Sequence, residues 1–587
     1  MGMTNKIASF WSFVKRVVHL SAPYFQSEKK WQARGMFLAI VVLNLGSVYM
    51  AVLFNAWYGI FYDALQNKDQ AVFWTQMGRF TYLAFIAIII AVYRFYLTQL
   101  LEMNWRQWMT GYYLRRWLGG NAFYQMELAR FVQQNGAAPD NPDQRISEDV
   151  NQFTSQTVGL TMGVLNASVT LASFVGILWT LSGAFGFSLG GQAYVIPGFM
   201  VWMAVLYCLV GSVLTHYIGR RQIKLNFEQQ RREADFRHHM VRVREYSEAI
   251  ALDRGQSVEK EHLTTRFLSV LSNYLALIKA QKSLIWFTSF FGQAAVVFPF
   301  IIAAPRYFSG AITLGVLMQI NSAFGRVQDS LSWFVDNYSG LAAWRATTDR
   351  LTGFDDAITR AEKGNRELEL AEASALDLRD LSVALPGGTM LLASTTLRAE
   401  RGEHVLLRGP SGSGKSTLFR TIAGIWPHAS GRVEHSRDAM FIPQRPYFPN
   451  GSLREALAYP ENTSHYTDEA MCAALAEAML PELADDLDRT DAWSQKLSGG
   501  EQQRLAIARV LLKQPSWVFA DEATSALDQT TEQTVYRKLI AMVEKSRGGI
   551  VSIAHRPSVA AFHTSCWELQ PTAPGAAARY TLRQTAL

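Results

Sequence analysis

The stretch EHVLLRGPSGSGKSTLF, residues 403–419, decides the fold of the C-terminal part of the chain. Its pattern is an apolar strand, a glycine-rich turn and a helix, with G-x-x-x-x-G-K-S running from Gly409 to Ser416. In this pattern the glycines let backbone N–H groups curl around phosphate oxygens, and the helix N-terminus adds partial positive charge. Lys415 reaches the β- and γ-phosphates, and Ser416 can ligate Mg²⁺. The stretch therefore predicts a nucleotide site in an α/β domain.

Three later segments each combine an apolar strand with a polar end. They are AMFIPQ ending at Gln444, WVFADE ending at Asp521 and Glu522, and GIVSIAH ending at His555. Because ligands gather at the carboxyl ends of strands in open α/β sheets, we expect these side chains to converge on one site. Asp521 suits a direct or water-mediated role at Mg²⁺, Glu522 suits polarising an attacking water, and His555 is placed to sense a γ-phosphate. The alternatives are an ordinary acidic turn and a structural histidine.

Composition separates the two halves of the chain. The 587 residues carry a net charge of +7, and the apolar residues crowd into roughly the first 340 positions. The basic residues cluster beside apolar segments, as in the cytoplasmic loops of membrane proteins, so no nucleic-acid partner is expected. Cys208, Cys472 and Cys566 lie far apart without ligand spacing, which indicates neither a disulfide framework nor a zinc site.

Six segments of the first half are predicted to span a membrane, because a bilayer core of ~30 Å needs about 20 apolar helical residues. They are about 36–60, 79–101, 158–181, 193–218, 284–304 and 312–334. The sixth is the weakest, because it holds Gln319, Asn321, Arg326 and Asp329. Either its polar face lines a water-filled route for a polar solute, or the span is shallow and Arg326 already lies in the cytoplasm.

The charges between the spans predict the topology. The stretch after the third span has no Lys or Arg, whereas GRRQIKLNFEQQRREADFRHHMVRVREY after the fourth is rich in them. By the positive-inside rule both termini are cytoplasmic. The long charged connections after the second and fourth spans predict helices that run well past the membrane. The expected domains are an amphipathic elbow segment at 1–34, a transmembrane domain at 35–345, a linker at 346–375 and an ATPase domain at 376–587.

The stretch LSGGEQQRLAIARVLL from Leu497, with GPSGSGKST, PQ, DEATSALD and AH in this order, resembles the ATPase domain of ABC transporters over roughly residues 376–565. SGGE is a glycine-containing helix N-terminus and hence a second anion site. The resemblance implies that it caps ATP held by the phosphate loop of a partner chain, so one copy per chain implies a homodimer with two composite sites. Ser525 to Asp528 resembles the segment through which the two sites sense each other.

The motifs together imply a set of ATP and Mg²⁺ contacts. The expected ATP contacts are Gly409, Pro410, Ser411, Gly412, Ser413, Gly414, Lys415, Ser416, Thr417, Gln444, Ser498, Gly499, Gly500, Glu501, Asp521, Glu522 and His555. The expected catalytic residues are Lys415, Gln444, Glu522 and His555, and the expected Mg²⁺ ligands are Ser416, Gln444 and Asp521. One position departs from the family, since Leu385 stands where an aromatic residue usually stacks on adenine. We therefore expect weaker adenine selectivity.

The membrane half resembles the SbmA/BacA-like bacterial permeases and the related peroxisomal, D-like ABC subfamily. The resemblance rests on FYDALQ (61–66), NWRQWMTGYYLRRWL (104–118), DNPDQRISEDV (140–150) and EYSEAIALDRGQSVEKEHL (245–263). It implies an all-α six-helix transmembrane domain of the exporter-like (type IV) ABC fold, followed by an α/β P-loop ABC nucleotide-binding domain. In such folds residues 140–150 would rest on an ATPase domain as a coupling helix. Arg145, Glu148 and Asp149 would then face the surface near Gln444, or brace the helices around it.

The resemblance implies an ATP-driven half-transporter in the lipid bilayer of the bacterial inner membrane. Its expected substrates are bulky hydrophilic compounds such as peptides or cobalamin-like solutes, taken up into the cell. Export of lipid, fatty-acyl or drug-like substrates and an ATP-gated channel or sensor are the alternatives.

Overall fold

The computed structural model describes residues 2–132, 141–182, 184–189, 192–363 and 367–586. The chain divides into two compact units. The helical unit comprises Met1–Tyr112 and Asp143–Thr352, and the sheet unit comprises Tyr113–Pro142 and Gly353–Leu587. Two long helices, α3 (Gln70–Leu118) and α11 (Tyr338–Glu362), contribute residues to both units.

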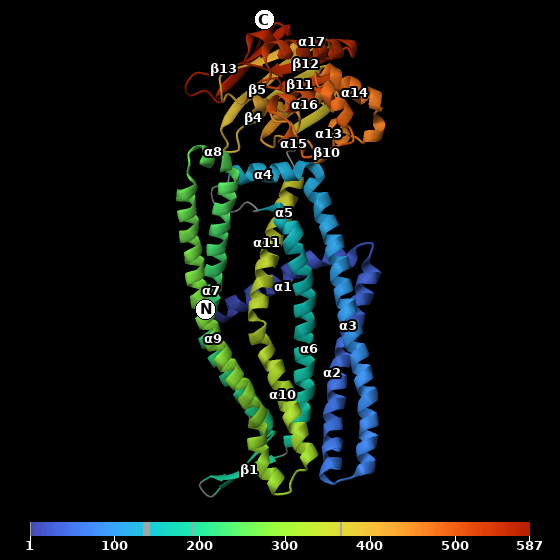
Figure 1. Ribbon diagram of the computed structural model, residues 1–587, viewed down its shortest axis with the longest axis vertical. Coiled ribbons are helices and arrows are strands. Elements are labelled where there is room, and N and C mark those ends of the chain that lie inside the picture. The colour runs from blue at the N-terminus through green and yellow to red at the C-terminus, as the bar shows by residue number, and fades with distance from the viewer. Residues whose placement is uncertain (1, 133–140, 183, 190–191, 364–366, 587) are drawn as a thin grey trace. The chain divides into compact units, whose positions relative to one another are not determined.

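The helical unit is a bundle of long helices, several of which run side by side in Figure 1. Its other helices are α1 (Gly2–Gln26), α2 (Lys30–Gln66), α5 (Pro142–Gln144), the π-helix η2 (Arg145–Asp149), α6 (Val150–Ser182), α7 (Phe199–Glu245), α8 (Ser247–Leu252), α9 (Gln256–Phe308) and α10 (Leu314–Asp336). Apolar side chains from α6, α7, α9 and α10 form one buried core, with Phe174 and Phe324 fully enclosed. Polar pairs between helices supplement it: the Asn55 and Gln319 side chains each donate to the other's backbone carbonyl, at 3.0 and 3.1 Å.

Five helices of the described chain are long and apolar enough to cross a membrane, namely α2, α3, the helix ending at Ser182, α7 and α9. They contain the first five predicted spans, apart from the start of the fourth. The sixth predicted span is the helix α10, whose polar residues keep it out of this set. The helices α3 and α7 continue beyond the second and fourth predicted spans, to Leu118 and Glu245, and α9 begins well before the fifth, as predicted for the two long connections.

The prediction that a helix begins at residue 193 is wrong. Gln192–Pro197 forms the strand β2, which pairs antiparallel with β1 (Ala184–Leu189), and α7 begins only at Phe199. Between them Gly198 has φ = 60°, a left-handed conformation that separates strand from helix. A Cβ there would lie 2.3 Å from the Trp179 ring, so glycine is required. Apolar composition alone does not distinguish a short strand from the first turns of a helix.

The sheet unit is an α/β domain around a ten-stranded sheet with the order β3-β7-β4-β5-β14-β13-β6-β12-β11-β8. The strands are β3 (Leu368–Glu372), β4 (Leu376–Ala384), β5 (Met390–Ala399), β6 (His404–Arg408), β7 (Ala429–His435), β8 (Met440–Ile442), β11 (Trp517–Asp521), β12 (Gly549–Ile553), β13 (Ser565–Pro571) and β14 (Tyr580–Ala586). Strands β8, β11, β12, β6 and β13 are parallel, and the central three, β11, β12 and β6, are almost wholly buried, as a sheet covered on both faces requires.

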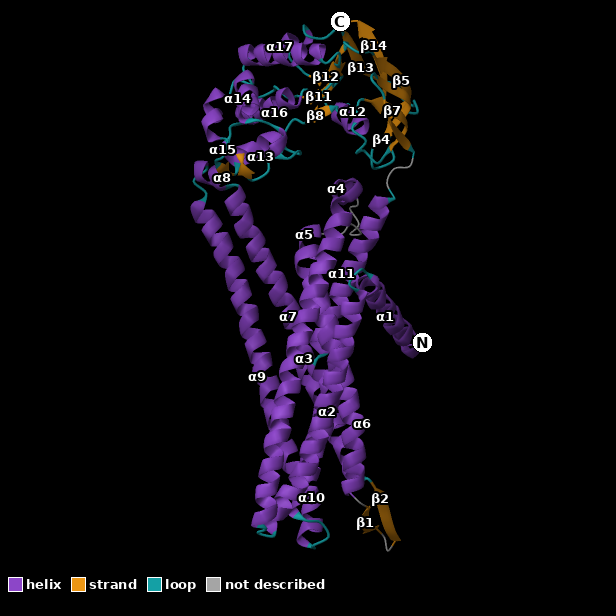
Figure 2. Ribbon diagram, turned by 90° about the vertical axis from the view of Figure 1, so that its right-hand side faces the viewer, coloured by secondary structure: helices purple, strands orange, loops and turns teal. Residues whose placement is uncertain are grey.

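The helices of the sheet unit are α4 (Ala122–Val132), α12 (Lys415–Ile422), α13 (Leu453–Ala458), α14 (Asp468–Glu477), α15 (Trp493–Lys496), α16 (Gly499–Lys513), α17 (Gln529–Lys545) and α18 (Pro557–Ala560). Figure 2 shows helices of the sheet unit next to its strands, and α12 and α16 begin within the phosphate-loop and SGGE motifs. A short two-stranded sheet pairs β9 (Gly451–Ser452), just before α13, with β10 (Thr490–Asp491), just before α15.

Candidate functional site

The phosphate loop joins β6 to α12 through a tight turn. Gly412 and Gly414 have φ of 75° and 90°, which L-residues other than glycine rarely adopt. A Cβ at Gly414 would also lie 2.3 Å from a methyl carbon of Leu391. Lys415 begins α12, and its Nζ donates hydrogen bonds to the carbonyl oxygens of Gly409 at 2.9 Å and Pro410 at 3.1 Å. The loop therefore wraps around the head of its own lysine.

The residues present fit a bound nucleotide phosphate. Lys415 is only 8% exposed, and its ammonium is held by neutral carbonyls, so its charge stays available to an anion. The hydroxyl of Ser413 is fully buried and has no hydrogen-bond partner within the described chain. The helix α12 also directs its N-terminus at the same loop.

The polar strand ends do converge. Strands β8, β11 and β12 are neighbours, so Gln444, Glu522 and His555 emerge at one edge of the sheet. Gln444 Nε2 donates to one Glu522 carboxylate oxygen at 2.8 Å, and His555 Nε2 donates to the other at 3.0 Å. Glu522 has φ = 47°, and its backbone N–H donates to the Ile553 carbonyl at 3.0 Å. A strained backbone thus orients a carboxylate that is held from both sides.

Asp521 lies one residue earlier and points at the phosphate loop. Burial raises the pKa of its carboxyl, and the charge of Glu522 raises it further, while a hydrogen bond with the Ser416 side chain acts in the opposite direction. A hydroxyl and a carboxylate in contact are the oxygen donors that Mg²⁺ prefers. Ser416 and Asp521 therefore fit a magnesium site, and the amide oxygen of Gln444 remains free of the bond to Glu522.

The SGGE motif forms the start of α16. Ser498 caps this helix, and its N–H and hydroxyl donate to the Glu501 carboxylate at 2.8 and 2.7 Å. These hydrogen bonds lower the pKa of Glu501. Ser498 and Gly499 remain exposed in the single chain, and Gly500 is half-buried. The helix N-terminus is thus formed and lies at the surface of the single chain.

Gln503 is a connecting residue that sequence reasoning missed. It is buried on α16, and its Nε2 donates to the Glu522 carbonyl at 3.3 Å and to Ser525 Oγ at 3.1 Å. Its Oε1 accepts from the Ala526 N–H at 2.9 Å. The amide therefore ties the SGGE helix to the segment after Glu522. In the sequence nothing distinguishes it from the neighbouring Gln502.

Leu385 closes a turn between β4 and β5. Its N–H donates to the Thr389 carbonyl at 2.8 Å, and its carbonyl accepts from Gly388 at 2.9 Å. The side chain is half-buried and packs against the core of the sheet unit. A ligand at this position would meet an aliphatic side chain and not an aromatic ring.

Residues 143–150 brace helices within the helical unit; Asp140 lies outside the described residues. Asp149 is 2% exposed and accepts hydrogen bonds from Arg145 and from Arg350 of α11, the latter at 2.6 and 2.9 Å. Both carboxylate oxygens of Asp149 are taken by these arginines, so this residue has the second of its two expected roles, bracing helices, and does not point to a free surface. Glu148 is exposed beside them.

The helix α4, and not residues 143–150, is a part of the first 350 residues that packs with the sheet unit. It belongs to the sheet unit, and its Leu128 packs against the core that contains Phe419 and Trp426. Burial raises the pKa of the Tyr124 hydroxyl, while the charge of Arg420 acts in the opposite direction. NWRQWMTGYYLRRWL, at the end of α3, leads directly into this element.

Comparisons with known proteins agree with this geometry. Residues 20–308 match the family described as ABC transporter transmembrane region 2, and residues 392–525 match the family described as ABC transporter. The inner membrane ABC transporter ATP-binding protein YddA of Escherichia coli is 32% identical, over 93% of this chain and 96% of its own. The chloroplastic ABC transporter D family member 2 of Arabidopsis thaliana is 32% identical, over 97% and 87%.

Two further matches extend the comparison. The human lysosomal cobalamin transporter ABCD4 is 24% identical, over 94% of each chain. The solved structure of a bacterial Atm1-family ABC exporter with ATP bound matches with a TM-score of 0.71 at 17% identity, over 94% of this chain and 96% of that one. This last likeness shows the fold: a helical transmembrane domain of exporter type followed by an α/β nucleotide-binding domain.

The phosphate loop, the converging polar strand ends and these matches lead to one conclusion: the chain belongs to the ABC transporter family, as a D-family-like, multi-pass half-transporter whose fused ATPase domain drives transport.

Proposed function

We propose that two copies of this chain form a homodimer that hydrolyses ATP at two composite sites and takes up bulky hydrophilic compounds, such as peptides or cobalamin-like solutes, across the bacterial inner membrane. Two relatives support the proposal. YddA is named an inner membrane protein, and ABCD4 is named a cobalamin transporter. The excess of Lys and Arg after the fourth span supports a cytoplasmic position for the termini and the ATPase domain.

Each residue of the site has a proposed role in hydrolysis. Lys415 and the backbone of residues 409–417 hold the phosphates, and Ser416, Asp521 and Gln444 hold Mg²⁺. Glu522 orients the attacking water and polarises it, while Gln444 and His555 keep its carboxylate in place. Mg²⁺, when bound, supplies positive charge that neutralises the developing negative charge on the phosphates. Ser498 to Glu501 would close the site of the partner chain.

The polar face of α10 is the observation that carries the hydrophilic substrate class. Ala323, Phe324 and Val327 are buried in the bundle core, whereas Arg326 and Asp329, one turn apart, are exposed. Charged groups inside a membrane protein face cavities or one another, because exposure to lipid costs roughly 2.5–3.5 kcal/mol for an arginine. A water-filled route beside α10 satisfies this requirement. A route for acyl chains does not.

Transport assays in sealed proteoliposomes test the proposal. Vesicles are loaded with ATP and Mg²⁺ on the ATPase side, and accumulation of labelled peptides, corrinoids, acyl-CoAs and lipophilic drugs is compared. We expect ATP-dependent movement of a hydrophilic solute against its gradient toward the ATPase side. Glu522→Gln should abolish it, and the double variant Arg326→Gln with Asp329→Asn should impair transport more than ATP binding.

Other outcomes would replace the proposal. Movement away from the ATPase side, or stimulation by acyl-CoAs or lipophilic drugs alone, would show an exporter of apolar substrates. Full-rate passage in Glu522→Gln that only follows the gradient would show an ATP-gated channel.

A further inference from the structure

The helices α7 and α9 form a long antiparallel pair, and Figure 2 shows them side by side over the part near α8. Polar and aromatic contacts join them at regular intervals. The Asn273 side chain donates to Gln229 Oε1 at 2.8 Å, Arg232 donates to the Ser269 carbonyl at 2.8 Å, and the rings of Phe236 and Phe267 lie 5.5 Å apart. These contacts fix the register of the two helices. The next position toward the α7–α9 connection holds His239, Glu259 and His262.

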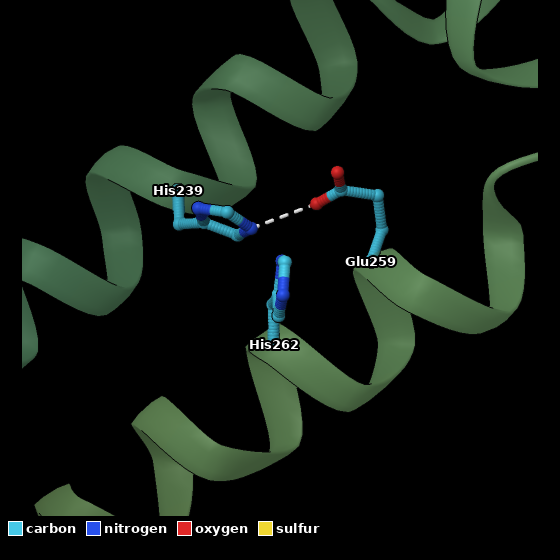
Figure 3. A group of neighbouring side chains, drawn as sticks. All are labelled: His239, Glu259 and His262. Atoms are coloured by element: carbon cyan, nitrogen blue, oxygen red, sulfur yellow. Dashed lines mark hydrogen bonds and ion pairs between the residues drawn. The ribbon is translucent and has the colours of Figure 1, made fainter.

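These three side chains converge between the helices (Figure 3). His239 Nε2 lies 2.8 Å from a Glu259 carboxylate oxygen, and the rings of His239 and His262 are 6.0 Å apart and nearly perpendicular. One ligand atom from each of the three residues lies within 4.8 Å of the others. His239 and Glu259 are half-buried and His262 is exposed, so the cluster is preformed and open to solvent.

We propose that His239, Glu259 and His262 bind a divalent transition-metal ion that links α7 to α9. Two imidazoles and one carboxylate suit Zn²⁺ and its neighbours in the first transition row, whereas Mg²⁺ prefers six oxygen ligands. Tetrahedral Zn²⁺ with bonds near 2.0–2.1 Å separates its ligand atoms by about 3.3 Å. The His239–Glu259 distance of 2.8 Å is shorter than this value, and all three ligand atoms already lie within 4.8 Å of one another, so small side-chain rotations would bring them to this spacing. A water molecule would complete the coordination.

The position of the cluster gives the ion a mechanical consequence. Glu259 and His262 are one turn apart on α9, while His239 comes from α7, so the ion joins the two helices. The cluster lies outside the predicted spans, about 20 residues beyond residue 218 and before residue 284. Nearby, α8 and its flanking turns connect the two helices. Bound metal would therefore hold the ends of this helix pair at a fixed separation.

Zinc binding by the full-length chain in lipid nanodiscs tests the proposal. The chain is purified without a polyhistidine tag, stripped with a chelator and titrated with Zn²⁺ against a chromophoric indicator in excess Mg²⁺. We expect one tight zinc per chain. Loss of even a supporting residue costs about 10–100-fold in metal affinity, so His239→Ala and His262→Ala should each weaken binding at least about tenfold. His238→Ala, next to the cluster and exposed, is the matched control and should bind like the unmodified chain.

Hydrogen exchange supplies a second readout. Zn²⁺ should slow exchange in residues 236–265 of the unmodified chain and of His238→Ala, and leave His262→Ala unchanged. Basal ATP hydrolysis checks that every variant is folded. The proposal is overturned if no saturable zinc binds in excess Mg²⁺, or if all variants bind equally. Loss in His239→Ala but not in His262→Ala would also overturn it, since the hydrogen-bonded pair would then be acting without the third ligand.

Discussion

Glu522 combines a strained backbone with a doubly held carboxylate. Its left-handed φ and its bonds to Gln444 and His555 leave little freedom for the side chain. Glu522→Gln keeps the size and one acceptor oxygen but removes the charge that polarises water. We expect ATP turnover to fall by about 10²–10⁴-fold, while fluorescent-nucleotide binding stays near that of the unmodified chain. Phosphate release measures the first quantity. If turnover stayed close to normal, another residue would have to polarise the attacking water.

His563 makes the stability of the sheet unit depend on pH. It is 7% exposed, and its Nδ1–H donates to the Val559 carbonyl at 2.8 Å. Burial lowers the pKa of His563 to about 4, and the nearby His404 and Arg408 add to the effect. Below pH 6.5 His563 binds a proton in the unfolded chain but stays neutral in the folded chain. The free energy of unfolding therefore falls as the pH falls toward 4. At pH 5.5 the loss should be about 1 kcal/mol.

A variant without a titrating ring isolates this effect. His563→Asn retains an N–H donor for Val559 and has no proton to gain in this range. We expect the melting temperature of the unmodified full-length chain to drop more between pH 7.5 and pH 5.5 than that of His563→Asn. Parallel pH profiles for the two chains would show that other groups govern the acid sensitivity.

At the scale of elements, the π-helix η2 is joined to α11 by Asp149 and its two arginines. Removing one partner from a fully buried ion pair costs about 3–5 kcal/mol, because a charge is left without compensation. The Arg350 side chain is 39% exposed, so water offsets part of this cost. Asp149→Asn should therefore melt below the unmodified chain in thermal unfolding. Glu148→Gln, at an exposed neighbour that accepts a hydrogen bond from Gln144 and acts on Arg350 only through its charge, is the matched control and should melt close to the unmodified chain. If Asp149→Asn and Glu148→Gln melted at the same temperature, the ion pairs of Asp149 would contribute no more to stability than a surface contact.

Elements with strong local signals could be predicted from sequence. The phosphate loop, the strand ends at Gln444, Glu522 and His555, and the long extensions of α7 and α9 follow from glycine placement, apolar runs and charge. The brace at Asp149 could not, because its partner Arg350 lies about 200 residues away. The strand β2 could not be predicted either, because its apolar composition fits a strand and the first turns of a helix equally well. The His239 cluster depends on the register of two helices, which no single-sequence pattern encodes.

At the scale of the whole molecule, one chain carries the phosphate-loop motif once and the SGGE motif once. The phosphate loop with Lys415 is formed, and so is the SGGE helix start at Ser498, which Gln503 ties to the segment after Glu522. An exposed helix N-terminus favours an anion. If the sites are composite, a chain needs the Ser498 of its partner and not its own.

Complementation between two inactive chains distinguishes these arrangements. Lys415→Ala removes the phosphate-binding charge, and Ser498→Arg blocks the helix N-terminus with a bulky side chain. Each homodimer should lose ATP hydrolysis. In a mixed dimer, however, the intact Lys415 of one chain faces the intact Ser498 of the other, and one complete site remains. We expect co-expressed chains, isolated through two different tags, to recover a measurable part of normal turnover.

No recovery from a correctly assembled mixed dimer would mean either that each chain closes its own site or that one site cannot turn over alone. Pairing the unmodified chain with one that carries both substitutions, which leaves no composite site intact, separates the two: activity there would place Lys415 and Ser498 of the same chain at one site.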